Sequence, residues 1–245
     1  KPATEGAELT QAVVQAIHES GFLPEGSLQL ICGQTYDLFD HLGPQDTVTF
    51  TGSASTGQQL RAHPLFNRYS IPFSMEADSV NSAILTENAD DTTIDLFVRE
   101  VFREMTTKAG QKCTAIRRAF VPAALLETVQ TRLVEKLKKV VVGDPACENV
   151  TMGALASVKQ KQDVAQRVEQ LSQQAQIVFG SHLNQDFNIE ADHPEKGAFY
   201  PPTVLVCQDP LQSDAIHQVE AFGPVCTLMP YQNIQELADL VSRGE

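Results

Sequence analysis

The sequence lacks several features that mark particular classes of protein. Its five cysteines are odd in number and widely spaced, with no Cys-x-x-Cys pair. This argues against a disulfide framework or a zinc site and favours a reducing cytoplasm. The six histidines form no His-Glu-x-x-His pattern, so we expect no metal. No apolar run approaches the roughly 18 residues of a membrane span, and the chain opens on a polar stretch instead of a signal peptide, so no membrane partner is expected.

Positive charge is also scarce. The formal net charge of -13 would repel phosphate backbones and anionic lipid, and lysine and arginine gather only in short pairs such as Arg117-Arg118. We therefore expect no nucleic-acid partner. With 42% hydrophobic and 20% charged residues, the composition is that of an ordinary globular protein, and 245 residues can form one large core or two modest ones.

Apolar periodicity predicts strands that alternate with helices, which is typical of an α/β fold with parallel, doubly wound sheets. The expected helices cover residues 8–20, 36–42, 93–107, 125–137, 158–175 and 234–241. The expected strands cover residues 47–51, 113–121, 140–142, 177–179, 204–207 and 226–231.

The alternation restarts near residues 77–84, which indicates two lobes. At the ends, Lys1 lacks the strand that would precede the first helix, and Glu245 follows a helix with no closing strand. Because missing flanking strands would expose sheet edges, we expect a fragment that lacks an N-terminal part and a C-terminal end.

A strand followed by Gly52 and Ser53 leads into a helix that contains Gly57. Glycine lets the backbone approach a ligand closely, and the free N–H groups of a new helix attract an anion such as a pyrophosphate. Such turns are common in α/β proteins, and this one is not the Gly-x-Gly-x-x-Gly of an ordinary dinucleotide fold.

Cys113 follows a long helix and lies beside Lys112, with Arg117 and Arg118 a few residues further on. Positive neighbours and free backbone donors favour a thiolate, which is the nucleophilic form of cysteine. The alternative is a buried structural cysteine. We expect that structural role for the cysteines inside apolar runs, and an inert loop position for the remaining one. These residues are Cys32, Cys207, Cys226 and, in the loop, Cys147.

Glu76 follows a largely apolar strand. Partial burial would favour its protonated form and suit it to act as a general base. The alternative is a strand-end acid that faces solvent.

The order of eight short motifs along the chain resembles that of the aldehyde dehydrogenase superfamily. In sequence these are Lys1-Pro2-Ala3, Gly21-Phe22-x-Pro24-x-Gly26, Phe50-Thr51-Gly52-Ser53 with Gly57, Glu76, Gly110-Gln111-x-Cys113, Val142-Gly143-Asp144-Pro145, Phe199-Tyr200-Pro201-Pro202-Thr203-Val204 and Glu220-Ala221-Phe222-Gly223-Pro224-Val225. The interval from Glu76 to Cys113 is close to the one that this family keeps between base and nucleophile.

One segment departs from the common family pattern. Leu-Gly-Gly-Lys usually follows the base, whereas this chain has Ala77-Asp78-Ser79-Val80-Asn81, so the resemblance does not define the backbone around the nicotinamide. The variant is similar to the semialdehyde dehydrogenase domain of the bifunctional enzymes of bacterial phenylacetate (oxepin-CoA) ring cleavage, and to the semialdehyde dehydrogenases of benzoyl-CoA pathways.

The resemblance implies a dinucleotide-binding part at residues 1–77 and a catalytic domain at residues 78–245. It implies that Cys113 attacks the aldehyde, that hydride passes to a nicotinamide, and that Glu76 activates the water that releases the acid. The Cys113 N–H would be one oxyanion donor. The family's second donor, an asparagine, would precede Lys1, so the fragment alone is expected to be inactive.

For the cofactor, the resemblance implies NAD or NADP. Lys1 matches the lysine of the adenosine ribose, and Thr4 stands where NAD-preferring relatives often carry glutamate, so NADP is favoured because no carboxylate repels its 2'-phosphate. The remaining matches are Gly52, Ser53 and Gly57 at the pyrophosphate and Glu220 and Phe222 at the nicotinamide ribose and ring.

The implied substrate is a small aldehyde, with a semialdehyde linked to a CoA thioester suggested by the subgroup. The implied parent is a homo-oligomer, and fusion to a hydratase domain stays open. Two alternatives also remain: a CoA-acylating dehydrogenase, against which Glu76 argues, and a catalytically silent nucleotide-binding or assembly module.

Overall fold

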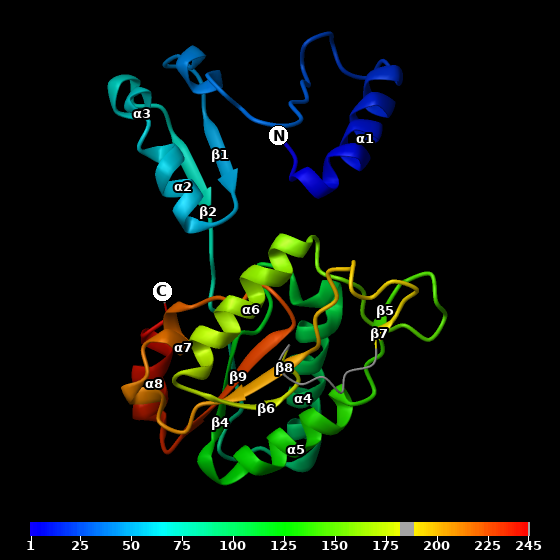
Figure 1. Cartoon of the computed structure of the whole chain (residues 1–245). Coiled ribbons are helices and arrows are strands. Elements are labelled where there is room, and N and C mark those ends of the chain that lie inside the picture. Colours follow the sequence, from blue (N-terminus) through cyan, green and yellow to red (C-terminus); the bar gives the residue numbers. More distant parts are fainter. Residues whose placement is uncertain (182–188, 245) are drawn as a thin grey trace. The chain divides into compact units, whose positions relative to one another are not determined.

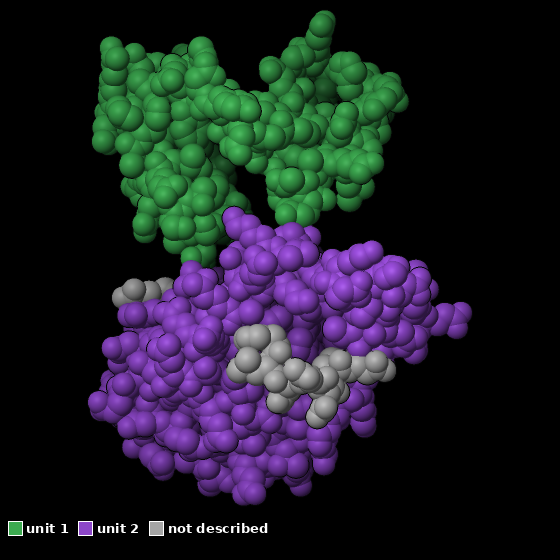
Figure 2. Space-filling model, in the orientation of Figure 1, with its two compact units in different colours: residues 1–78 green, residues 79–245 purple. Residues whose placement is uncertain are grey.

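The computed structural model describes residues 1–181 and 189–244. The chain forms two compact units, Lys1–Asp78 and Ser79–Glu245, which are coloured separately in Figure 2. Each unit has its own parallel strand pairing and its own buried side chains. None of the helices in the described part of the chain is both long and apolar enough to cross a bilayer.

The first unit contains a small βαβ arrangement (Figure 1). Strand β1 pairs in parallel with β2, so that Thr51 lies opposite Glu76 at the carboxyl end of both strands. Phe66 is buried and makes edge-to-face contacts with Phe39 and Phe73. In chain order the elements are η1 (Thr4–Gly6), α1 (Ala7–Glu19), η2 (Leu38–His41), β1 (Val48–Thr51), α2 (Ala54–Arg61), α3 (Pro64–Tyr69) and β2 (Phe73–Glu76).

Most apolar side chains of this first unit remain accessible. Leu9 and Val13 on the predicted apolar face of α1 are exposed, although the helix itself forms as expected. Residues 28–32 adopt no regular structure, and Cys32 is exposed. The expectation of a buried structural Cys32 is therefore wrong, because the apolar run around it does not enter a core.

The second unit is built on a sheet with the strand order β3-β4-β9-β8-β6, plus a short β5-β7 pair. Its elements are β3 (Ser82–Ile84), α4 (Asp91–Thr106), η3 (Thr107–Gly110), β4 (Arg118–Pro122), η4 (Ala123–Leu125), α5 (Leu126–Leu137), β5 (Val142–Gly143), α6 (Val158–Ser172), β6 (Gln176–Phe179), β7 (Ile189–Glu190), β8 (Thr203–Val206), η5 (Pro210–Gln212), α7 (Ala215–Gln218), β9 (Val225–Tyr231) and α8 (Ile234–Ser242). Strands β4, β8 and β9 are buried along their whole length.

The connections make this sheet doubly wound. Helix α4 joins β3 to β4 in one direction across the sheet, and α7 joins β8 to β9 in the opposite direction. Because parallel crossovers are almost always right-handed, these two helices lie on opposite faces. The strand order thus confirms the expected α/β fold with parallel, doubly wound pairing.

Two expectations about strands need correction. Strand β6 runs antiparallel to β8, because a helix-to-strand alternation does not fix the direction of a strand added at the edge of a sheet. The strand expected at residues 113–121 begins only at Arg118. Lys108, Ala109 and Gly110 have positive φ angles, so the chain turns before the strand and leaves Cys113 outside the ladder.

Candidate active site

Cys113 is exposed in a turn between η3 and β4. The sequence hypothesis of a structural cysteine therefore does not describe it. Cys207 and Cys226, by contrast, are buried in the sheet as predicted. Burial raises the pKa of the Cys226 thiol to about 12, and it raises the pKa of Cys207 too, so neither ionises readily near neutral pH. Cys147 is partly exposed in a loop.

The turn reaches its position through a close backbone contact at Gly110. A Cβ atom on this residue would lie 2.1 Å from the carbonyl oxygen of Gly223, and its φ angle is +68°. Both observations require glycine here. The contact places the chain just before Cys113 against the loop that carries Glu220 and Phe222.

Two side chains bind the carbonyl oxygen of Cys113. Ser79 Oγ donates to it at 2.8 Å, and Asn81 Nδ2 donates to it at 2.6 Å. Asn81 Nδ2 also lies 3.2 Å from the carbonyl oxygen of Ala115. Within the described ranges no acceptor is bound to the Cys113 N–H, which leaves this donor available to a ligand.

Arg117 joins three segments around the turn. Its guanidinium donates to Glu220 Oε1 at 3.1 Å, to the Gly223 carbonyl at 2.7 Å and to the Gly110 carbonyl at 2.9 Å. It also lies 5.4 Å from the centre of the Phe222 ring. Burial lowers the pKa of Arg117, and Glu220 opposes that shift.

The positive neighbours proposed to activate Cys113 are engaged elsewhere. Lys112 Nζ lies 2.7 Å from Glu104 Oε1, and Arg117 pairs with Glu220. Arg118 donates to the Val80 carbonyl at 2.9 Å and lies 3.1 Å from His217 Nδ1. Lys112 and Arg117 are thus paired with carboxylates, and among the described residues the unbound Cys113 N–H is the free backbone donor beside the thiol.

Both carboxylate oxygens of Glu220 already accept a hydrogen bond. Its Oε1 receives Arg117 and its Oε2 accepts the Ser79 N–H at 3.0 Å. A carboxylate can accept about four hydrogen bonds, so capacity for a ribose hydroxyl remains. Phe222 is exposed and offers a ring face at the same loop.

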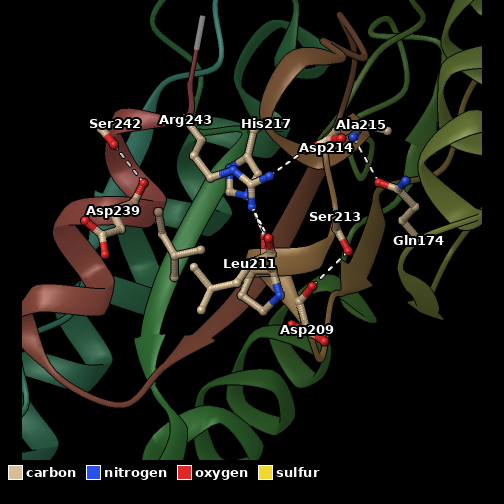
Figure 3. Close-up of polar contacts among 12 residues, drawn as sticks. Gln174, Asp209, Leu211, Ser213, Asp214, Ala215, His217, Asp239, Ser242 and Arg243 are labelled. Atoms are coloured by element: carbon tan, nitrogen blue, oxygen red, sulfur yellow. Dashed lines mark hydrogen bonds and ion pairs between the residues drawn. The ribbon is translucent and has the colours of Figure 1, made fainter.

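A polar cluster shown in Figure 3 holds the segment that precedes this loop. Arg243, just after α8, donates to the carbonyl oxygens of Pro210 and Leu211 and pairs with Asp214. Buried His217 contributes through Nε2, which lies 2.9 Å from the Pro210 carbonyl. The start of the Glu220 loop is thereby fixed to the C-terminal helix of the unit.

In the first unit, the Gly52-Ser53 turn leads into α2 as predicted. Ser53 is the N-cap and its Oγ accepts the Thr56 N–H. The Ala54 N–H, at the start of the helix, donates to Asp78 Oδ1 at 3.3 Å. A carboxylate therefore already lies at the position proposed for a pyrophosphate, and the donors present suit an anion.

Gly57 of α2 packs closely on the strand pair. A Cβ atom there would lie 2.3 Å from Met75 Sδ and 3.1 Å from Phe50 Cδ1, so a larger residue would force these side chains to move. Glu76 ends β2, and its carbonyl oxygen accepts the Gly52 N–H at 3.1 Å. Its side chain is exposed, so the expected partial burial is not found. Four predicted residues, Gly52, Ser53, Gly57 and Glu76, thus come together in this unit.

Lys1 and Thr4 lie before α1 and are exposed. The Lys1 ammonium donates to the carbonyl of its neighbour Pro2. In the described part of the unit, the one side-chain hydrogen bond of Lys1 and Thr4 is this exposed contact, so both side chains are accessible to a ribose.

Three residues that bind the Cys113 turn were not predicted as part of a site. Ser79 and Asn81 lie in the segment that departs from the common family pattern, and that departure was the available signal. Arg117 was noted only as a positive neighbour, and its contacts with Gly110, Gly223 and Glu220 depend on chain reversals that no local pattern encodes.

Known proteins are similar to this chain over its whole length. A 3,4-dehydroadipyl-CoA semialdehyde dehydrogenase from Aromatoleum evansii is 41% identical over 247 residues, which cover 100% of this chain and 47% of the relative. A 1-pyrroline-5-carboxylate dehydrogenase from Oceanobacillus iheyensis is 28% identical over 100% of this chain and 46% of its own length. The chain thus spans about half the length of these curated relatives.

Solved structures show the same architecture. A betaine aldehyde dehydrogenase from Staphylococcus aureus, in complex with NAD+, superposes with a TM-score of 0.81 at 25% identity and covers 96% of this chain and 45% of that protein. A model of the aldehyde dehydrogenase family matches residues 1–243. A match over nearly every residue, from Lys1 through Cys113 and the Glu220 loop, means that the chain belongs to the aldehyde dehydrogenase family.

Proposed function

We propose that the protein oxidises an aldehyde to a carboxylic acid, with Cys113 as the nucleophile and Glu76 as the general base. The observation that carries the proposal is the Cys113 turn. Its sulfur is exposed, its carbonyl oxygen is held by two side chains, and its N–H is unbound among the described residues. This arrangement suits a thiol that attacks a carbonyl carbon beside a donor for the oxygen.

The chain's own groups support the following sequence. The Cys113 thiolate forms a bond to the aldehyde carbon, and the Cys113 N–H stabilises the negative oxygen. After oxidation the acyl group remains on the sulfur as a thioester. Glu76 then takes a proton from water as the water attacks that thioester, and the carboxylic acid leaves with Cys113 restored.

A nicotinamide cofactor would accept the hydride in the oxidation step. Gly52, Ser53 and Gly57 would hold its pyrophosphate, because the start of α2 already binds the carboxylate of Asp78. Lys1 would meet the adenosine ribose, and Glu220 and Phe222 would position the nicotinamide ribose and ring. Thr4 supplies no carboxylate against a 2'-phosphate, which favours NADP over NAD.

For the substrate, we propose a semialdehyde attached to a CoA thioester. The relative from Aromatoleum evansii that is 41% identical bears the name of such a substrate. The residues Ala77 to Asn81 also resemble that subgroup and not the common Leu-Gly-Gly-Lys pattern. We propose that the complete protein acts in the cytoplasm as a homo-oligomer in aromatic degradation, and fusion to a hydratase domain belongs to the same proposal.

The test uses the complete natural protein that contains this sequence, with 3,4-dehydroadipyl-CoA semialdehyde and NADP. We expect NADPH and free acid to form in equal amounts without added CoA. Cys113→Ser should abolish turnover, while Cys32→Ser, which changes another exposed cysteine, should preserve it. Turnover that requires CoA and yields a second thioester would instead identify an acylating dehydrogenase. Absence of NADPH formation would overturn the proposed oxidation.

Iodoacetamide labelling of this chain tests the nucleophile independently of the substrate. Cys113 should react much faster than Cys32 near neutral pH, although both are exposed. Cys207 and Cys226 should stay unlabelled until the chain unfolds, because both are buried. Equal rates at Cys113 and Cys32 would remove the nucleophile assignment.

A further inference from the structure

The carbonyl oxygen of Cys113 is held by side chains from a distant part of the chain. Ser79 and Asn81 precede it by 34 and 32 positions and lie 2.8 and 2.6 Å from it. A carbonyl oxygen has two lone pairs, so these two donors fill its normal capacity. An exposed turn would not be expected to hold one orientation without such contacts.

Asn81 also fixes the residues that follow. Its Nδ2 lies 3.2 Å from the Ala115 carbonyl, and its own carbonyl accepts the N–H groups of Arg117 and Arg118 at 3.0 Å. Asn81 directly precedes β3, a strand of the main sheet. The turn and the start of β4 are therefore both bound to the residue that leads into β3, the edge strand of the main sheet.

Ser79 connects the same turn to the Glu220 loop. Its N–H donates to Glu220 Oε2 while its Oγ donates to the Cys113 carbonyl, and Asn81 Nδ2 lies 3.0 Å from that Oγ. One short segment thus contacts both the nucleophile's backbone and the loop proposed for the nicotinamide ribose. This segment is where the sequence differs from the common family pattern.

We propose that Ser79 and Asn81 are positioning residues. They hold the Cys113 turn so that its thiol can attack the aldehyde carbon while its free N–H donates to the aldehyde oxygen. The inference rests on the proposed function and adds two residues to that site. Preorganised donors stabilise developing charge because they need no reorientation during the reaction. The two side chains supply that preorganisation by restraining the adjoining peptide units.

The proposal differs from a purely structural role in what it predicts. If the two residues only stabilised the fold, Ser79→Ala and Asn81→Ala would lower thermal stability and leave the chemistry of folded molecules unchanged. If they position the nucleophile, the rate of the chemical step falls while the Michaelis constant for the aldehyde stays nearly constant. Ser79→Thr keeps the hydroxyl group and should restore the rate.

The experiment measures the pre-steady-state burst of NADPH by the complete protein with 3,4-dehydroadipyl-CoA semialdehyde. In the double variant Ser79→Ala/Asn81→Ala we expect the burst rate constant to fall by at least about tenfold, with the Michaelis constant within about threefold of wild type. Matched controls are Ser172→Ala and Asn149→Ala. The Ser172 hydroxyl donates to the Glu169 carbonyl and the Asn149 amide donates to the Glu190 carboxylate, so neither contact involves the Cys113 turn. A wild-type burst in the folded double variant would overturn the proposal.

Two further readouts separate this inference from the proposed function. If wild type forms no NADPH, the proposed oxidation is wrong. Iodoacetamide labelling of the chain then tests the positioning role of Ser79 and Asn81 without the substrate. The ratio of Cys113 to Cys32 labelling rates should then fall at least about threefold in the double variant, because the thiolate loses a fixed backbone donor. An unchanged ratio would overturn the positioning role. If the double variant does not fold, Ser79→Ala and Asn81→Asp are compared by the same measurements.

Discussion

Arg117 Nε lies 3.1 Å from Glu220 Oε1, and only 5% and 8% of the two side chains are exposed. Because the same guanidinium binds the carbonyl oxygens of Gly110 and Gly223, the pair joins the chain on both sides of the Cys113 turn to the Glu220 loop. Removing one partner of such a buried pair leaves the other charge uncompensated, even where the intact pair adds little net stability.

Replacing Arg117 with methionine should strongly destabilise the second unit. The change leaves Glu220 buried without a counter-charge, for which a loss of about 3–5 kcal/mol in the free energy of unfolding is typical. Urea unfolding measures this loss. Arg132→Met is the matched control, since Arg132 pairs with exposed Asp91 and Asp95, and its effect should be clearly smaller.

The double variant Arg117→Met/Glu220→Gln should be more stable than Arg117→Met alone. Removing both charges avoids the isolated carboxylate, so the two effects should not add. Additive losses would show that the pair is not coupled.

Buried His217 should make stability depend on pH. Burial lowers the pKa of His217 below its usual 6.5, and its Nδ1 faces the Arg118 guanidinium at 3.1 Å. Below pH 6.5 the unfolded chain therefore takes up a proton that the folded chain does not, so stability falls on acidification. The slope from this group is at most about 1.4 kcal/mol per pH unit between 6.5 and the lowered pKa.

Urea unfolding between pH 7.5 and 5 tests this effect. His217→Gln should reduce the loss of stability on acidification, whereas His193→Gln, which changes an exposed histidine, should leave it nearly unchanged. An identical pH dependence in wild type and His217→Gln would show that other groups cause it.

The sequence predicted most elements of the fold because their signals are local. Helix α1 begins within a residue or two of the predicted start, and β8 and β9 coincide with their apolar runs. The antiparallel direction of β6 and the late start of β4 were not predicted. Strand direction at a sheet edge and positive φ angles at Lys108 and Ala109 depend on tertiary contacts.

Cys113 was predicted as the nucleophile from its motif and its positive neighbours, but the ion pairs of those neighbours were not predicted. The sequence indicated positive neighbours; in the structure Lys112 pairs with Glu104, eight positions earlier, whereas Arg117 pairs with Glu220, 103 positions later. Ion-pair partners separated by a hundred residues leave no local pattern. The side chains of Ser79 and Asn81 bind the turn from 34 and 32 positions away, which local patterns do not predict either.

Asp78 should compete with an anionic cofactor at the start of α2. Its carboxylate lies 3.3 Å from the Ala54 N–H, where a pyrophosphate would be held. Asp78→Asn removes the like charge, so the dissociation constant for NADP, measured by calorimetry, should fall by roughly threefold to tenfold. Glu25→Gln makes the same charge change at an exposed position and should have little effect. Weaker NADP binding in Asp78→Asn would contradict this role.

Thr4 should influence the choice between the two nicotinamide cofactors. A carboxylate at this position would accept a hydrogen bond from the ribose 2'-hydroxyl of NAD and repel the 2'-phosphate of NADP. Thr4→Glu should therefore lower the NADP-to-NAD ratio of kcat/KM by about tenfold, or about 1.4 kcal/mol. Gln11→Glu adds the same charge on exposed α1 and serves as the control. An unchanged ratio in Thr4→Glu would show that selectivity lies elsewhere.

The proposed roles of Cys113 as nucleophile and Glu76 as general base are tested most directly by Glu76→Gln in the complete protein. With NADP and 3,4-dehydroadipyl-CoA semialdehyde, we expect a burst of about one NADPH per active site, followed by little turnover, because thioester hydrolysis lacks its base. Mass spectrometry of the quenched enzyme should find the acyl group on the Cys113 peptide. Wild-type steady-state turnover by this variant, with Cys113 unmodified, would contradict the account.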